Sequence, residues 1–124
     1  MSEVSPHSIN MVKHILRFRQ VNKDIFEDIK KGRKTVETRA ATSRFKNITS
    51  GDAVVFICGK EKFEKTVKRS QIFKSIVSML SQYKIKDIMP RLSTEEELKK
   101  AYYSYPKYKE KIKKFGLVAL EFNE

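Results

Sequence analysis

The sequence GRKTVETR, residues Gly32–Arg39, closes one predicted helix and opens a strand. Within it Lys34, Glu37 and Arg39, which we call the charged triad, stand where a buried strand would normally begin with apolar residues. In an extended strand Thr35 shares a face with Glu37 and Arg39, because alternate side chains point the same way. The charged triad therefore either forms a solvated ion pair or lines a pocket.

The order of charges within the triad suggests a chemical role for each residue. Two cationic neighbours favour the ionised form of Glu37, which makes it a poor general acid and a good hydrogen-bond acceptor. Such a carboxylate can accept from the exocyclic amine on a base edge. Lys34 and Arg39 would then contact phosphate or carbonyl oxygens. The alternative is an ion pair of purely structural value at the mouth of a barrel.

Apolar patterns and end signals predict the elements around this stretch. In chain order they are a strand over 13–18, a helix capped by Asn22 and ended by Gly32, strands over 34–39, 53–58 and 63–73, helices beginning at Ser75, at Ser93 or Thr94 and at Pro106, and a closing strand over 117–122. The inward positions of the strand over 63–73 change from Phe63 and Val67 to Ile72, which indicates a bulge or bend near Arg69.

This order of elements predicts an α+β fold, in which a small, mixed, strongly curved sheet has helices at its ends. Five or six strands with such a bend suffice for a partial barrel. Residues 1–12 carry no periodic apolar pattern and are predicted to be a flexible N-terminal tail. Residues 13–124 are predicted to form a single domain, as expected for a chain of 124 residues.

Several classes of protein are disfavoured by composition. The longest apolar run is too short to span a membrane, and no hydrophobic segment near the N-terminus resembles a signal peptide. The single cysteine, Cys58, lies in an apolar run and is predicted to be a buried, reduced thiol of an intracellular protein, cytoplasmic or nuclear. No cofactor or metal is expected, because no Cys/His cluster has ligand spacing and His7 and His14 are interpreted as incidental.

The charge balance points to a polyanionic partner. The net charge is +12, and the pI is about 9.8, which is typical of nucleic-acid binding domains. A lysine-rich solvated surface is the alternative interpretation. Tyr102, Tyr105 and Tyr108 have helical spacing and are predicted to lie mostly in the core. Tyr103 lies off that stripe and is the better candidate to stack on a base.

A resemblance to a known family supports this interpretation. Gly32 and the charged triad match the GxKxxExR signature of the ASCH domain, a branch of the PUA-like superfamily. The preceding helix, the Gly51-Asp52 turn and the final strand also resemble that family, so the likeness covers about residues 13–122. The resemblance implies a five- or six-stranded pseudobarrel with flanking helices, a cleft lined by the motif, and a role in RNA binding or RNA-linked processes.

The family also includes enzymes. One branch hydrolyses acetylated cytidine with the motif lysine, a threonine three residues later as nucleophile, and a distal glutamate. Here Glu37 holds the threonine position, and Thr35 is displaced by about 7 Å along the strand. This departure argues against amidohydrolase chemistry. Cleavage of RNA with Lys34 and Glu37 as catalytic acid and base stays as a further alternative.

The predicted function is therefore the binding of RNA, or of a nucleotide derived from it, in a cleft beside the charged triad. Arg33, Arg44 and Lys46 are predicted to form its electropositive rim, and a single-stranded or extruded base would fit better than a duplex. The second hypothesis is an enzyme, either a small hydrolase that acts on a modified nucleoside or a ribonuclease. The third is a protein-interaction module whose basic surface meets an acidic protein partner. None of these places the chain in a membrane.

Overall fold

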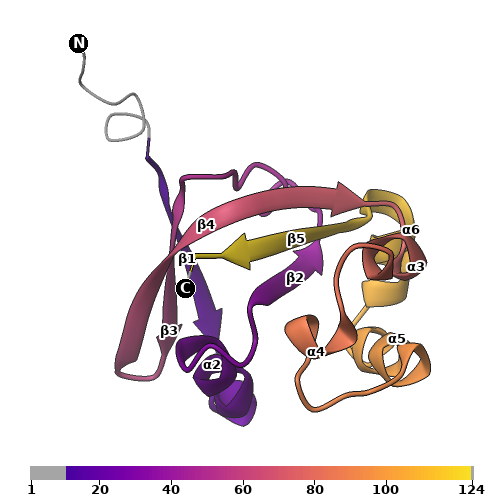
Figure 1. Ribbon diagram of the computed structural model, residues 1–124, viewed down its shortest axis with the longest axis horizontal. Coiled ribbons are helices and arrows are strands. Elements are labelled where there is room, and N and C mark those ends of the chain that lie inside the picture. The colour runs from indigo at the N-terminus through magenta and orange to yellow at the C-terminus, as the bar shows by residue number, and fades with distance from the viewer. Residues whose placement is uncertain (1–10, 124) are drawn as a thin grey trace.

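The structure, a computed structural model, describes residues 11–123 (Figure 1). The predicted tail lies outside these residues except for its last two positions, and His7 lies outside them as well. The elements in chain order are β1 (Lys13–Phe18), the 3-10 helix η1 (Gln20–Asn22), α2 (Lys23–Lys30), β2 (Val36–Ala40), β3 (Ala53–Cys58), β4 (Glu61–Phe73), α3 (Ile76–Leu80), α4 (Ile85–Ile88), α5 (Glu95–Tyr103), α6 (Tyr108–Phe115) and β5 (Leu117–Phe122).

The five strands form one curled sheet in the order β1-β3-β4-β5-β2. β1 runs parallel to β3, and the other neighbouring pairs are antiparallel. The long strand β4 joins the two halves of the sheet, and its pairing with β5 shifts register between Val67 and Arg69. Such an irregularity bends a strand and lets a sheet curl. The predicted α+β half-barrel, including the bend near Arg69, is confirmed.

Helices cover this sheet at two places (Figure 1). Helix α2 packs Phe26 and Ile29 into a core with Val118 and Leu120 of β5. Helices α3, α5 and α6 gather at the other end of the sheet and form a second core, which includes Leu117. Because successive side chains of β5 alternate between these two cores, the strand is buried on both faces.

The end of β4 differs from the sequence-based prediction at Ile72. Ile72 pairs with Val118 and shares its face of the sheet, so the predicted change of alternation is present. The prediction that Ile72 points into the core is wrong, because Ile72 is 51% exposed. Cys58 is a buried free thiol, as predicted. Between residues 11 and 123 no helix has the length and apolar character needed to cross a membrane.

Candidate functional site

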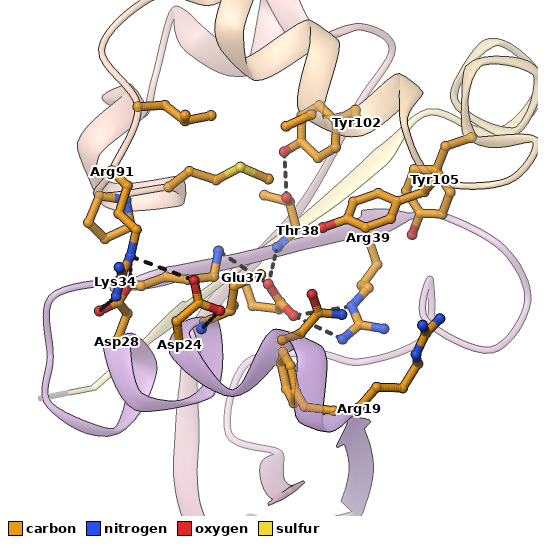
Figure 2. A pocket seen from close by; sticks show the side chains of 18 of the residues that line it. Arg19, Asp24, Asp28, Lys34, Glu37, Thr38, Arg39, Arg91, Tyr102 and Tyr105 are labelled. Atoms are coloured by element: carbon orange, nitrogen blue, oxygen red, sulfur yellow. Dashed lines mark hydrogen bonds and ion pairs between the residues drawn. The ribbon is translucent and has the colours of Figure 1, made fainter.

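A pocket of about 620 Å³ lies between the barrel and the helices (Figure 2). One wall comes from the end of β1 and the start of α2, and the other comes from α5, α6 and the segment that follows α4. The side chains of β2 lie between these walls. Since β2 is the last strand in the order of the sheet, residues from both of its faces reach the pocket. The volume is in the range of small-molecule sites.

The lining combines aromatic and charged side chains. The aromatic residues are Phe18, Tyr102, Tyr105 and Tyr108, and the charged residues are Arg17, Arg19, Asp24, Asp28, Lys34, Glu37, Arg39, Arg91 and Lys111. In the view of Figure 2, Tyr102 and Tyr105 face Arg19 from the opposite side of the pocket. Aromatic rings next to several cations suit a ligand that is planar and carries negative charge.

The turn after α2 places Lys34. Gly32 has a positive φ of 79°, which reverses the chain at the end of the helix. The backbone N–H groups of Arg33 and Lys34 then donate to the carbonyl oxygen of Asp28, at 2.9 and 3.0 Å. Lys34 thus precedes β2 rather than belonging to it. Strand alternation does not fix its direction, and its side chain turns to the same side as Glu37.

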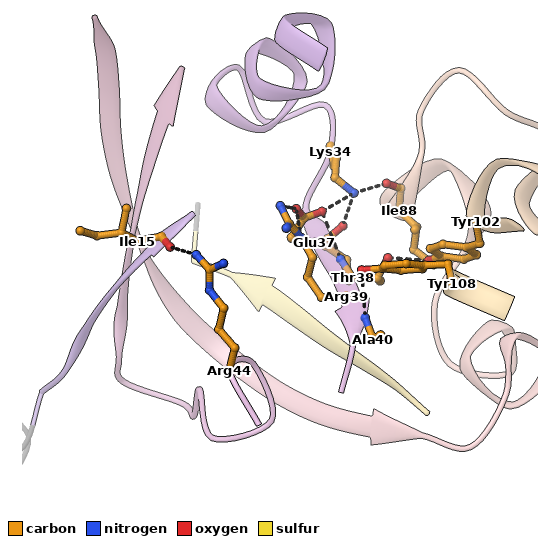
Figure 3. A network of polar contacts seen from close by, with 11 residues as sticks. Ile15, Lys34, Glu37, Thr38, Arg39, Ala40, Arg44, Ile88, Tyr102 and Tyr108 are labelled. Atoms are coloured by element: carbon orange, nitrogen blue, oxygen red, sulfur yellow. Dashed lines mark hydrogen bonds and ion pairs between the residues drawn. The ribbon is translucent and has the colours of Figure 1, made fainter. Parts of the chain in front are cut away.

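The ammonium group of Lys34 is buried and fully engaged. Its side chain is 3% exposed, and Nζ donates to the carbonyl oxygens of Val36, at 2.8 Å, and of Ile88. The third contact is with Oε1 of Glu37, at 3.2 Å. An ammonium group has three N–H donors, so each of them has a partner inside the protein. Figure 3 shows these contacts converging on Nζ.

Both carboxylate oxygens of Glu37 are also occupied by contacts within the protein. Oε1 accepts from the backbone N–H of Thr38 at 3.2 Å as well as from Lys34. Oε2 accepts from Nε and Nη2 of Arg39, at 3.1 and 3.0 Å. With Glu37 only 5% exposed, the charged triad is a buried ion-pair network that borders the pocket. It is not the solvated ion pair that the sequence left as an alternative.

The pKa values of the pair follow from these surroundings. Burial alone would raise the pKa of Glu37, but the charges and hydrogen bonds of Lys34 and Arg39 outweigh it and lower the pKa below its usual value. Burial lowers the pKa of Lys34, and the neighbouring carboxylate of Glu37 opposes that effect. Glu37 is therefore ionised in the folded protein at neutral pH, as its sequence context predicts.

Acid is expected to destabilise the fold through Glu37. Since its pKa is lower in the folded than in the unfolded chain, its contribution is complete above the unfolded pKa and is lost as the pH falls through the folded pKa. The free energy of unfolding should therefore decline below about pH 4.5. Urea denaturation at stepped pH values would measure this, and a Glu37→Gln variant should show a shallower decline. Identical declines in both proteins would contradict the expectation.

Arg39 faces the pocket with part of its guanidinium group. Its side chain is 24% exposed, and its Cζ atom lies 5.5 Å from the ring centre of Phe18 and 5.4 Å from that of Phe45. Two aromatic rings and the Glu37 carboxylate thus hold the guanidinium plane. Among residues 11–123, no hydrogen-bond acceptor lies against Nη1. This end of Arg39 is available to a ligand.

A second buried carboxylate joins the two walls of the pocket. Asp28 is 2% exposed and accepts from Nε of Arg33 at 2.8 Å and from Nε of Arg91 at 3.1 Å. The contact with Arg91 ties α2 to the segment between α4 and α5. Burial would raise the pKa of Asp28, but its hydrogen bonds with Arg91 and Arg33 lower it. Asp28 is therefore held as an anion that links the two walls of the pocket.

Hydroxyl groups line the helical wall. Oγ1 of Thr38 is hydrogen-bonded to Oη of Tyr102, and Oη of Tyr108 accepts from the backbone N–H of Ala40 at 3.3 Å (Figure 3). These contacts attach α5 and α6 to β2. Thr38, Tyr102, Tyr105 and Tyr108 were not selected from the sequence as pocket residues. The helical spacing of the three tyrosines correctly indicated that Tyr102 is buried, whereas Tyr105 and Tyr108, also predicted to lie mostly in the core, are only partly buried. Spacing carries no information about a cavity beside them.

The structure brings together only part of the predicted site. The charged triad borders the pocket, whereas Thr35, Arg33, Arg44, Lys46 and Tyr103 are absent from its lining. Arg44 packs on the ring of Phe45 and donates to the carbonyl oxygen of Ile15 at 3.5 Å. Tyr103 is 39% exposed and has Nζ of Lys109 at 5.6 Å from its ring centre.

The cations that do line the pocket come from elsewhere in the chain. They are Arg17 and Arg19 at the end of β1, Arg91 after α4 and Lys111 on α6. Each of these residues is a single cation outside any motif, so the sequence did not indicate that it lines a pocket. His14, outside the pocket lining, contacts Oδ2 of Asp52 at 2.8 Å. Among residues 11–123, no three His, Cys, Asp or Glu side chains are grouped in a way that could hold a metal ion.

Comparison with known proteins extends over nearly the whole chain. Residues 20–124 match the family model of the ASCH domain. The crystal structure of hypothetical protein PH0355 is similar at 28% identity and a TM-score of 0.77, over 90% of this chain and 98% of that chain. The solution NMR structure of protein PF0455 from Pyrococcus furiosus is similar at 26% identity and a TM-score of 0.71, over 90% of this chain and 96% of that chain. No curated protein matched the sequence.

Proposed function

The chain belongs to the ASCH domain family, and from this premise we propose that it binds RNA, or a nucleotide derived from it, in the pocket beside the charged triad. A single-stranded or extruded base enters between the tyrosines and Arg39, and the attached phosphates stay at the mouth. The observation that carries the proposal is the free end of Arg39, a fixed cationic donor in a pocket with an aromatic wall.

Cations at the mouth support the placement of phosphate. Arg17, Arg19 and Lys111 line the pocket and are exposed, and among the described residues they form no ion pair with a carboxylate. The net charge of +12 adds a long-range attraction for a polyanion. Phosphate groups of a bound nucleotide would therefore meet cations whose charge is not already neutralised.

The aromatic wall supports the placement of a base. Tyr105 and Tyr108 are in edge-to-face contact with ring centres 5.4 Å apart, and both line the pocket. Stacking of a base on an aromatic side chain contributes about 1–3 kcal/mol and does not depend strongly on sequence. Single-stranded nucleic acid offers such a base face, whereas a duplex hides it.

Within this proposal the members of the triad have different roles. Lys34 and Glu37 have their donors and acceptors occupied inside the protein, so we assign them to holding Arg39 in place. Arg39 makes the direct contact with the ligand. This replaces the direct contacts that the sequence suggested for Lys34 and Glu37.

Hydrolysis receives less support from the same contacts. A lysine acts as a base through a free amine, and Nζ of Lys34 has all three of its donor directions satisfied by Val36, Ile88 and Glu37. The hydroxyl of Thr38 lines the pocket one position beyond the nucleophile position of the amidohydrolase branch, and it is hydrogen-bonded to Tyr102. We therefore favour binding.

Removing the mouth cations tests the proposal. A variant with Arg17→Ala, Arg19→Ala and Lys111→Ala should bind a short fluorescent single-stranded RNA about tenfold or more weakly than the unchanged protein. The slope of log affinity against log salt should become shallower by about 2, since each lost phosphate contact changes it by about 0.7. Fluorescence anisotropy over a salt series measures both quantities.

A second triple variant provides the matched control. Lys46→Ala, Lys62→Ala and Lys113→Ala remove the same charge from exposed positions that do not line the pocket. This variant should retain most of the affinity and most of the salt slope. If the two triple variants lose affinity equally, attraction is spread over the surface and the pocket is not the site. If the unchanged protein binds no RNA or nucleotide, the proposal fails altogether.

A further inference from the structure

We propose that the base taken up by this pocket is guanine, with Arg39 donating to its O6 and N7 atoms. The inference rests on the proposed function, because it names which nucleotide enters the pocket described above.

Arg39 has a free forked edge. A guanidinium group carries five N–H donors in a plane. Nε and one N–H of Nη2 point at Oε2 of Glu37, at 3.1 and 3.0 Å. The second N–H of Nη2 and one N–H of Nη1 then lie parallel at the far end of the group. Parallel donors of this kind suit a ligand with two neighbouring acceptors.

The orientation of this edge is fixed before any ligand binds. The rings of Phe18 and Phe45 lie at 5.5 and 5.4 Å from Cζ of Arg39. The carboxylate that holds Nε is itself held by Lys34 and by the backbone N–H of Thr38. A donor that is already ordered loses little conformational entropy on binding, which favours selective recognition.

Few bases present two neighbouring acceptors. Guanine does so with O6 and N7, the pair that arginine contacts most often in nucleic acids. Adenine places its N6 amine, a donor, beside N7. In uracil the two carbonyl oxygens are separated by a ring N–H. Cytosine offers O2 and N3, so guanine and cytosine fit the fork, and adenine and uracil do not.

The depth of Arg39 in the pocket separates guanine from cytosine. Arg39 is 24% exposed, whereas Arg17, Arg19 and Lys111 are exposed side chains on the same pocket. With the phosphate at these outer cations, the base must present to Arg39 an edge that extends away from its ribose. O6 of guanine lies across the ring system from the glycosidic nitrogen, so the edge formed by O6 and N7 extends away from the ribose. O2 and N3 of cytosine are both bonded to the ring carbon next to the glycosidic nitrogen, so that edge has no acceptor as remote from the ribose as O6. The pocket therefore favours guanine.

Ligand analogues test this without altering the protein. Calorimetric titration of the unchanged protein should give an affinity for GMP about tenfold or more above those for AMP, CMP and UMP, the discrimination expected of a bidentate arginine contact. 7-Deaza-GMP, which lacks only the N7 acceptor, should bind about tenfold more weakly than GMP. Ribose 5-phosphate, which has no base, serves as the probe for phosphate binding alone.

A conservative variant tests whether Arg39 is the residue that recognises the base. Arg39→Lys keeps the positive charge beside Glu37 but removes the fork. In this variant the preference for GMP over AMP should disappear, and the affinity for ribose 5-phosphate should fall much less than the affinity for GMP. A thermal melt reports whether the variant is folded, and the 7-deaza-GMP result does not depend on it.

The outcomes are distinct. Equal affinities for GMP and CMP, or for GMP and 7-deaza-GMP, overturn the guanine assignment while nucleotide binding in the pocket stands. If Arg39→Lys weakens ribose 5-phosphate as much as it weakens GMP, then Arg39 holds phosphate and the assignment is wrong. Failure of every nucleotide to bind removes the proposed function itself.

Discussion

Alanine in place of Glu37 is expected to destabilise the protein by about 3–5 kcal/mol, the typical cost of breaking a buried ion pair from one side. The substitution leaves the ammonium of Lys34, 3% exposed, facing two carbonyl oxygens without its counter-ion. It also removes Oε2, the oxygen that accepts hydrogen bonds from Nε and Nη2 of Arg39. A cation stranded in this way must either stay charged without compensation or give up its proton, and both cost free energy.

Urea denaturation measures this effect, and Glu64→Ala is the matched control. Glu64 is also a strand glutamate paired with a lysine, Lys13, at 3.3 Å, but their side chains are 43% and 58% exposed. An exposed pair contributes about 0–1 kcal/mol, so Glu64→Ala should change the free energy of unfolding very little. A loss below about 1 kcal/mol for Glu37→Ala would mean that water reaches Lys34 and that the charged triad is not buried.

A double variant separates the stranded charge from lost packing. Lys34→Met with Glu37→Leu removes the buried pair and fills similar space with apolar groups. Replacement of a buried pair by apolar residues is often neutral or stabilising, whereas removal of one partner is not. The double variant should therefore be more stable than Glu37→Ala. A double variant that is less stable than Glu37→Ala would contradict this account.

The fold could be predicted because its signals are local. Gly32 stops α2 and adopts the positive φ expected of a C-terminal stop. Thr94 caps α5 through a capping box with Glu97, one of the two alternatives that the sequence allowed. The change of inward positions along β4 marked the register shift between Val67 and Arg69. Each of these signals depends on neighbours in sequence and therefore needs no knowledge of tertiary contacts.

The depth of the charged triad could not be predicted, because distant segments create it. Ile88, which supplies a carbonyl oxygen to Lys34, lies at the end of α4. That helix is one turn long, has no side-chain cap, and was not identified from the sequence. Spacing within residues 34–39 indicates that the charges are neighbours, but only the packing of α4 against β2 determines that they are buried.

The cations that line the pocket differ from those predicted for its rim for a related reason. Arg33 and Arg44 were placed on the rim because they flank the motif in sequence. Arg33 is instead held by Asp28, and Arg44 lies on Phe45 and the β1 backbone. Arg19 reaches the pocket because η1 and α2 follow β1 directly, which places the end of that strand beside the triad. Proximity in sequence is a poor guide to a site built from four segments.

Gly116→Ala is expected to destabilise the protein by roughly 2–5 kcal/mol, from left-handed backbone strain together with a steric clash. Gly116 has a φ of 82°, and a Cβ atom there would lie 2.4 Å from the carbonyl oxygen of Phe73. A backbone atom of a paired strand cannot move away as a flexible side chain can. Gly116 also joins α6 to β5, and its carbonyl oxygen accepts from the backbone N–H of Ala41 at 2.9 Å.

Gly51→Ala separates the two causes, because Gly51 has a φ of 92° and open space where a Cβ would stand. It should cost only the strain, about 1–2 kcal/mol in urea denaturation. If the chain relieves the clash at Gly116 by shifting α6, Tyr108 and Lys111 move away from β2, and nucleotide affinity should fall in Gly116→Ala but not in Gly51→Ala. Equal losses of stability in the two variants would contradict this account, because they would show that the close approach to Phe73 does not constrain the junction of α6 and β5.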